Sequence, residues 1–418
     1  MRFVITLLLA VPVLWAQDDM SNMAGMAGMA GMPGMQHSDA AMEASGTSFN
    51  PASSPMTMAH FAAGGWNFAA HGVAFLVDTQ QSGPRGGDKL FSANWFMGEA
   101  SHAAGGGTFR VRSMLSLDPA TITSGRYPEL FQTGETWRGV PIVDGQHPHD
   151  FFMELALEYT HPLGAKTKLT LYAAPVGDPA LGPVAFPHRV SAAELPQATL
   201  AHHLEDSTHI SYDVVTAGIA CGIFGLEASG FHGAEPGENR WTITQGAIDS
   251  WSARFTLTPN ANWTGQFSAG RLTHPEALEP GDQVRTTASV TYNRPYAHGN
   301  WASSLIWGRV HKTDGHANLN GYGLESVARF LGGNYVTGRI ELVDKDELFL
   351  PGSALYSESF RVGAYTAGYT RDLRLIPRIA TGLGANLTSY SMPGELHSYY
   401  GRRPTGVLVF LRLRLRES

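Results

Sequence analysis

The feature that most constrains the fold is a series of short segments, from about Trp66 onward, in which apolar residues alternate with polar or small ones. In one segment Trp251 and Phe255 share one face of an extended strand, while Ser252 and Arg254 share the other. A soluble sandwich and a membrane barrel both produce this alternation. The sixteen candidate strands are 65–80, 89–103, 107–118, 150–161, 166–175, 208–221, 224–233, 249–258, 261–273, 283–294, 299–312, 319–330, 333–345, 358–372, 377–391 and 405–416.

The lengths of the connections distinguish these two folds. Connections after odd-numbered strands tend to be long, as at 119–149, 176–207 and 234–248, whereas those after even-numbered strands tend to be short. This rule, with an even strand count, is typical of a transmembrane barrel, in which short turns face the periplasm and long loops face outside. The sequence therefore predicts an all-β fold, a transmembrane antiparallel β-barrel of about 16 strands over residues 64–418, with both termini periplasmic.

The last predicted strand suits a barrel wall in lipid. Its odd positions from Val407 to Leu415 are apolar and share one face, and three arginines share the other. The chain ends in Arg416-Glu417-Ser418, whereas many outer-membrane proteins end in an aromatic residue. Aromatic residues near other strand ends are expected to form interfacial girdles, namely Trp263, Trp301, Tyr292 and Tyr159.

Composition agrees with this class. Only 16% of the residues are charged, against about 25% in a typical soluble domain. A formal charge of −7 offers no basic surface, so no nucleic-acid partner is expected. Cys221 is the single cysteine, which excludes an intramolecular disulfide and a Cys-rich zinc site.

The first residues have the pattern of an export signal. Arg2 provides one positive charge, an apolar stretch runs from Val4 to Trp15, and Ala16 stands where cleavage is expected. The stretch is too short to span a bilayer. We predict a signal peptide at 1–17 and a cell outer membrane of Gram-negative type as the location.

A methionine-rich head follows the signal. Six methionines recur at an interval of three residues, which matches neither the period of a helix nor that of a strand, so packing does not explain them. A thioether is a soft donor that suits Cu(I), whereas the alternative is a low-complexity tract without function. Because the tract 18–63 is rich in Gly and poor in aromatic residues, we expect it to be disordered. Its candidate metal ligands are Met20, Met23, Met26, Met29, Met32, Met35, His37, Met42, Met56, Met58 and His60.

Histidines supply a second set of candidate ligands. Eight of the 17 histidines lie between positions 147 and 232, mostly in the long loops, with carboxylates among them. Imidazole and carboxylate together suit Zn(II), Cu(II) or Ni(II). The alternative is a set of structural or pH-sensitive polar loops. The selected candidates are His147, His149, His202 and His203, with Glu205 and Asp206 beside the last pair.

The loop 176–207 contains several prolines, which stiffen it and keep it out of the sheet. We expect this loop to fold into the lumen and narrow it. Two outcomes stay open for the charges of the wall: they line an open passage, or they pair across the lumen and close it. These charges are Glu154, Glu158, Arg254, Arg339 and Glu341.

The signal, the Met-Gly-Met-His head and the barrel, in this order, resemble the outer-membrane copper-resistance protein B family. The resemblance implies that copper is bound or moved at the outer membrane. The partners expected for such a barrel are outer-membrane lipid, metal ions and a periplasmic metal-handling protein. The segments Gly145–Phe151, Glu235–Trp241 and His274–Gly281 are similar to segments of bacterial barrels without an assigned role. A general porin-like channel and a structural barrel without a metal role are the alternatives. A hydrolase is disfavoured, and the chain is expected not to be an enzyme, because it contains no Gly-x-Ser-x-Gly pattern before a helix.

Overall fold

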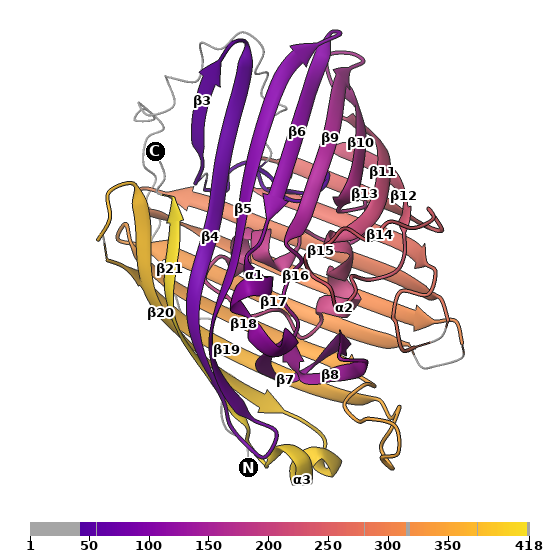
Figure 1. Cartoon of the computed structure of the whole chain (residues 1–418). Coiled ribbons are helices and arrows are strands. Elements are labelled where there is room, and N and C mark those ends of the chain that lie inside the picture. The colour runs from indigo at the N-terminus through magenta and orange to yellow at the C-terminus, as the bar shows by residue number, and fades with distance from the viewer. Residues whose placement is uncertain (1–41, 56, 280, 315–317, 374, 416–418) are drawn as a thin grey trace. The chain divides into compact units, whose positions relative to one another are not determined.

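A computed structural model describes residues 42–55, 57–279, 281–314, 318–373 and 375–415 (Figure 1). The candidate ligands between Met20 and His37, and Met56, lie outside the described residues, as does the signal peptide. No helix in the described part of the chain is long and apolar enough to cross a membrane.

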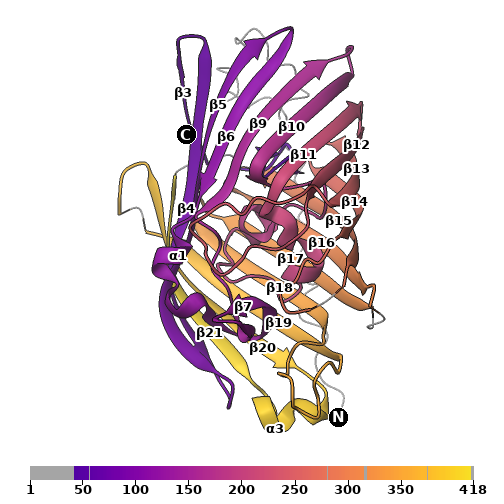
Figure 2. The ribbon, with the colours of Figure 1, turned by 45° about the vertical axis from the view of Figure 1, so that its right-hand side comes forward.

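Sixteen long strands close into one antiparallel barrel, as the sequence predicts, and β21 pairs with β4 to complete the ring (Figures 1 and 2). Each of the sixteen predicted segments corresponds to one strand, and most ends agree within two residues. A short additional strand, β3 (Ala59–Ala63), pairs with the first part of β4, ahead of the stretch that β21 covers. The sixteen strands are β4 (Trp66–Gln81), β5 (Gly87–Ala104), β6 (Gly107–Leu115), β9 (Phe152–Pro162), β10 (Thr167–Gly177), β11 (Ser211–Cys221), β12 (Phe224–His232), β13 (Ser250–Asn260), β14 (Trp263–Leu272), β15 (Gln283–Tyr296), β16 (Gly299–Lys312), β17 (Leu319–Phe330), β18 (Asn334–Lys345), β19 (Phe360–Asp372), β20 (Ile379–Ser391) and β21 (Thr405–Leu415).

The two ends of the barrel differ as the loop lengths predict. Turns of two residues, such as 105–106, 222–223 and 261–262, lie at one end. The longest connections, 116–151 and 178–210, leave the other end. We refer to these as the short-turn end and the long-loop end.

The outer surface of the wall is apolar. Exposed side chains on alternate strand positions include Leu76, Leu171, Leu226 and Leu305, while their neighbours on the inner face are largely buried. In β21 the exposed residues Val407 and Val409 alternate with buried residues that end in Arg412, which confirms the orientation expected for this strand. Such an outer face is stable in hydrocarbon, because every strand has its backbone hydrogen bonds within the closed ladder.

An aromatic group lies next to the short turns. The rings of Trp263 and Tyr292 are 4.4 Å apart between centroids, and those of Tyr292 and Trp301 are 5.5 Å apart. Trp263 directly follows the turn 261–262, Trp301 is the third residue after the turn 297–298, and both are exposed. This is the arrangement of an interfacial girdle.

The lumen is filled by three segments of the chain. The first is 44–55, which follows β1 (Met42–Glu43) and contains β2 (Phe49–Asn50), the strand that pairs with β1. The second is 116–151, with α1 (Asp118–Thr121), η1 (Thr123–Gly125) and the hairpin of β7 (Tyr127–Trp137) and β8 (Val140–Gln146). The third is 178–210, with η2 (Phe186–His188), η3 (Val190–Ala192), α2 (His202–Glu205) and η4 (Ser207–His209). Between β20 and β21, η5 (Gly394–Leu396) and α3 (His397–Tyr400) lie in the last long loop.

The expected disorder of 18–63 is wrong for its described C-terminal part. Residues 44–55 are mostly buried, and polar groups of the wall and of the segment 178–210 bind their backbone and side chains. Ser45 Oγ donates to Asp178 at 2.8 Å, and Arg112 donates to the Gly46 carbonyl at 2.7 Å. The chain therefore enters the lumen well before the predicted barrel boundary at residue 64.

Candidate metal centre

The structure brings together three of the four histidines that the sequence singled out in the long loops. His147 follows β8, and His202 and His203 are the first two residues of α2. Their ring centroids are 5.1 to 5.9 Å apart, and one nitrogen from each ring lies within 4.8 Å of the other two. Three nitrogens around a tetrahedral ion lie about 3.3 Å apart, since each bond is about 2.0–2.1 Å long. A small rotation of the rings would therefore allow all three to reach one ion.

The surrounding groups orient these rings for ligation. Each ring places its Nδ1 within 3.3 Å of an oxygen acceptor, namely the Pro148 carbonyl for His147, the Asp206 carboxylate for His202 and the Glu235 carboxylate for His203. An acceptor at Nδ1 holds the proton there and leaves the lone pair on Nε2, as in many protein metal sites. The Nε2 of His203 is buried and has no hydrogen-bond partner, and the Nε2 of His147 is buried with a carboxylate oxygen of Glu135 at 3.3 Å.

The same group of rings continues toward the wall. His149, the fourth candidate, lies 5.5 Å from His209 between ring centroids, and His209 lies 5.3 Å from His202. The Nδ1 atoms of His149 and His209 also lie next to oxygen acceptors, at 2.8 Å from Asp118 and 2.7 Å from the Asp206 carbonyl. Sequence reasoning did not select His209, although it lies in the same histidine-rich stretch.

Burial keeps several of these rings neutral. Desolvation, with repulsion from neighbouring imidazoles, lowers the pKa of His147 well below 6.5, and desolvation also lowers the pKa of His202. The pKa of His209 is lowered to about 3 by desolvation and by the nearby His202. Neutral imidazole is the form that binds metal, so protons compete weakly for these nitrogens.

Two carboxylates lie beside the imidazoles. The carboxylate of Glu135 is 3.3 Å from His147 Nε2, and it also pairs with Arg240. Glu235 lies beside His203 and pairs with Arg285 at 3.0 Å. The donor set of imidazole nitrogens and carboxylate oxygens suits Zn(II), Cu(II) or Ni(II).

Glycines make room for this site. A side chain at Gly134, whose φ is +118°, would collide with the ring of His203. On the wall, a side chain at Gly308 would collide with the Leu204 carbonyl of α2, and one at Gly321 would lie 2.7 Å from Ala201 Cβ. The long-loop halves of β16 and β17 therefore fix the height of α2 within the barrel.

The predicted charges of the wall face the lumen, where they are buried and paired. Arg112 lies 3.3 Å from Glu154, Arg110 lies 2.7 Å from Glu158, and Glu341 accepts the Leu200 amide at 2.6 Å. Arg254 pairs with Glu227 at 2.9 Å and Arg339 with Glu325 at 3.0 Å. Of the two outcomes left open by the sequence, these contacts favour a closed lumen.

The described candidates from the head do not join the histidine group. Met58 is half-buried, and His60 is exposed on β3 at the short-turn end. Of Met42, only its backbone pairing with Asn50 is described. A second group of possible ligands, Glu276, Glu279 and Glu347, surrounds Lys312, which pairs with two of the three carboxylates and with Asp346. These acidic residues are explained by that lysine.

No protein-family profile and no curated protein matches the chain. Among solved structures, an anion-selective porin from Comamonas acidovorans is similar, with 12% sequence identity and a TM-score of 0.51 over 84% of this chain and all of that one. OprB of Pseudomonas putida is similar with 9% identity and a TM-score of 0.50, over 84% of this chain and 94% of that one. At such identities the likeness concerns the fold alone, which is that of a porin-type outer-membrane barrel.

Proposed function

We propose that this chain is an outer-membrane barrel that binds transition-metal ions, copper among them, inside its lumen and passes them across the envelope. The observation that carries the proposal is the convergence of His147, His202 and His203, each with its Nδ1 next to an oxygen acceptor. His102 and His232 also place Nδ1 next to a carbonyl oxygen, so the support comes from the meeting of three such rings, whose nitrogens lie within 4.8 Å of one another. Outer-membrane lipid surrounds such a protein, and a periplasmic metal-handling protein would receive or supply the ion.

The test is metal binding by the purified chain in detergent. Cu(II) and Zn(II) are titrated into the wild type and into the His202→Ala/His203→Ala variant, in competition with a chelator. We expect the variant to lose at least a hundredfold in affinity, since loss of an outer-shell partner alone costs about 10- to 100-fold. The control is His161→Ala/His311→Ala, which removes two imidazoles at strand positions outside the site. Equal affinities in all three proteins would refute the lumenal site.

The methionine-rich head is proposed as a Cu(I) collector on the same protein. Thioether sulfur prefers Cu(I) or Ag(I) to Zn(II), and a tethered ligand raises the local concentration of ion near the barrel. Replacement of the six evenly spaced methionines, Met20 to Met35, by Leu keeps apolar bulk and removes sulfur. We expect the Leu variant to bind fewer Cu(I) ions and the same number of Zn(II) ions. Unchanged Cu(I) stoichiometry would end this reading of the head.

A general porin-like channel is the second candidate function. The sixteen-stranded fold and its likeness to an anion-selective porin support it. The filled lumen argues against a permanently open pore, because the charges of the wall are paired with one another or with the inserted segments. Single-channel conductance in a planar bilayer distinguishes the two: a general porin conducts chloride and potassium steadily without metal.

A further inference from the structure

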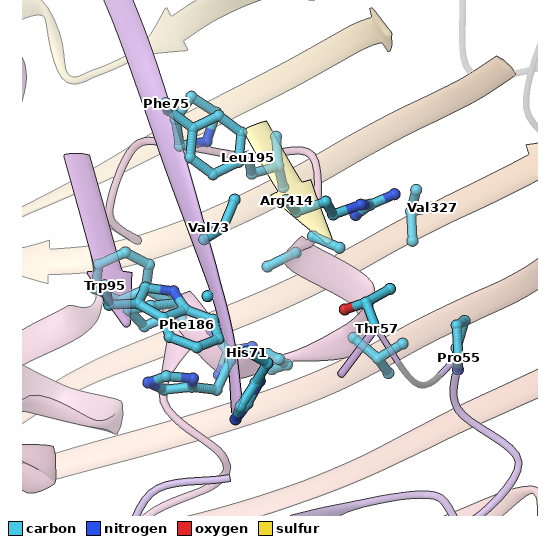
Figure 3. A pocket seen from close by; sticks show the side chains of 18 of the residues that line it. Pro55, Thr57, His71, Val73, Phe75, Trp95, Phe186, Leu195, Val327 and Arg414 are labelled. Atoms are coloured by element: carbon cyan, nitrogen blue, oxygen red, sulfur yellow. The ribbon is translucent and has the colours of Figure 1, made fainter. Parts of the chain in front are cut away.

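In another part of the lumen, His71 and His188 line a cavity of about 150 Å³, and Met97 contacts His71 beside it. The cavity lies between β4, β5, the loop 186–196, residues of 50–55 with Thr57, and side chains of β16, β17, β18 and β21. Figure 3 shows Trp95, Phe186 and His71 together on one side of this cavity, with Pro55 and Thr57 on the other. Aromatic and aliphatic side chains form much of its wall, and polar side chains also line it, among them Asn50, Asn94, Arg189, Arg329 and Arg414.

The first two donors are held by strand register. His71 of β4 and Met97 of β5 are directly opposite partners in the ladder, and both side chains face the lumen. The distance between His71 Nε2 and Met97 Sδ is 3.0 Å. A nitrogen at about 2.0 Å and a sulfur at about 2.3 Å from one tetrahedral ion lie about 3.5 Å apart. An outward shift of about half an ångström at this pair would therefore admit an ion.

His188 supplies the third donor. Its Nε2 is buried and has no hydrogen-bond partner, and its ring lies 4.2 Å from that of Trp95, which in turn lies 5.1 Å from the ring of His71. The side chain of Asn50 fixes the backbone around His188, because it donates to the His188 carbonyl at 2.9 Å and accepts from the Val190 amide at 3.1 Å. Burial, with repulsion from His71, lowers the pKa of His188 well below 6.5.

We propose that His71 Nε2, Met97 Sδ and His188 Nε2 form a site for a soft monovalent ion, Cu(I), distinct from the histidine group of α2. Thioether with imidazole is a soft, neutral donor set, so a monovalent ion leaves less net charge at this site than a divalent one, beside arginines that are paired with Glu325 and Glu194. The indole face of Trp95 excludes water and is attractive to a cation. Several buried imidazoles of this chain have an unpartnered Nε2, and His188 is the one whose ring contacts the indole that also contacts His71.

The two sites lie at different heights in the barrel. His71 is near the short-turn end of β4, whereas α2 rests on Gly308 and Gly321 in the long-loop halves of their strands. His149, which contacts His209 of the α2 group, lines the same cavity as His71 and His188. The inference extends the proposed function by a Cu(I) site near the short-turn end of the barrel. It does not require that the histidine group of α2 binds metal.

The experiment uses the full chain in detergent with ¹³C-labelled methionine methyl groups and Ag(I) as a redox-stable probe for Cu(I). The six methionines of the head are replaced by Leu, so that they do not compete for the ion. We expect Ag(I) to shift the methyl resonance that Met97→Leu removes. Met114 is the matched control, because it is buried in the same apolar cluster, and Leu replaces Met at little cost in stability.

Competition with a Cu(I) chelator gives the second readout. We expect Met97→Leu and His188→Gln each to weaken Cu(I) binding at least tenfold, with Met114→Leu at the wild-type value. The Met97 shift should persist in His202→Ala/His203→Ala, so failure of the α2 site and failure of this site are separate results. A Met97 resonance that Ag(I) leaves in place, or equal losses in Met97→Leu and Met114→Leu, would overturn the proposal.

Discussion

Glu325 is the residue whose replacement should most directly release the segment 178–210 from the barrel wall. It lies on β17 with 1% of its side chain exposed. Its carboxylate accepts from Arg189 Nε at 2.8 Å, from Arg339 Nε at 3.0 Å and from Ser191 Oγ at 3.1 Å. Arg189 and Ser191 belong to the inserted segment, whereas Arg339 belongs to the wall. One buried carboxylate therefore joins the two.

The change Glu325→Gln removes the charge and keeps the volume. Removal of one partner from a buried ion pair costs about 3–5 kcal/mol, because the remaining charge stays buried without compensation. Arg189 retains a weaker contact with Asp206 at 3.4 Å, so we expect the lower end, about 3 kcal/mol. If this free energy destabilises only the state in which the segment 178–210 is inserted, the ratio of barrels with a released segment to barrels with an inserted one rises about a hundredfold.

Conductance in planar bilayers measures this ratio. We expect the wild type to open rarely and Glu325→Gln to spend a much larger fraction of time in a conducting state. The control is Asp344→Asn, which removes a carboxylate from a pair between two wall strands, with the exposed Arg361 at 2.8 Å. Such a pair is worth about 0–1 kcal/mol and does not touch the inserted segment. Equal open fractions in wild type and Glu325→Gln would refute the reasoning, as would equal opening in the control.

Three further changes test other parts of the structure. The Val side chain in Gly308→Val should collide with the Leu204 carbonyl and push α2 away from the wall. Zn(II) binding, measured in a chelator competition, should weaken at least tenfold. The control Gly338→Val, at a position where a side chain has room, should leave Zn(II) binding unchanged. Val409→Arg, on the outer face, should destabilise the barrel by about 2–4 kcal/mol in urea titrations in lipid vesicles. Because burial lowers the pKa of His209 to about 3, the stability that depends on its neutral form is complete above about pH 6.5 and is lost as the pH falls. Metal-free protein should lose about 3 kcal/mol between pH 7.5 and 4.5 through this group, and His209→Gln should lack this component in acid-unfolding curves.

The barrel was predictable because every strand has one face toward lipid and one face toward the lumen. Lipid selects apolar residues on one face and the lumen selects polar or small ones on the other, so a period of two persists from Trp66 to Leu415. The inserted segments obey no such period. Residues 44–55 lie next to a Gly-rich tract in the sequence, and their burial depends on contacts such as Ser45 with Asp178, which are distant in the chain. No local pattern in that tract specifies the partner.

The sequence predicted the residues of one candidate site but not those of the other. The α2 histidines were found because their types and density suggest ligation, although their contact with His147 depends on how the β7–β8 hairpin enters the lumen. The pair of His71 and Met97 depends on register. The sequence predicts the connection between the first two strands at 81–88, whereas the structure has it at 82–86. A hairpin folded symmetrically about the predicted connection would pair His71 with Gly98 instead of Met97. A slip of one residue moves a side chain to the other face of the sheet, so this pair was out of reach.

The charges that close the lumen also decide how a metal ion could cross it. Arg189 with Glu325, Arg112 with Glu154 and Arg412 with Glu194 fix inserted segments or wall strands at separate points, so no single pair holds the lumen closed. An ion that moves by ligand exchange along the imidazoles needs these pairs intact, because they position the ligands. An ion that moves through a transient opening needs them to break. Glu325→Gln should therefore slow metal passage into vesicles if exchange dominates and accelerate it if opening dominates, while chloride and potassium conductance rises in both cases.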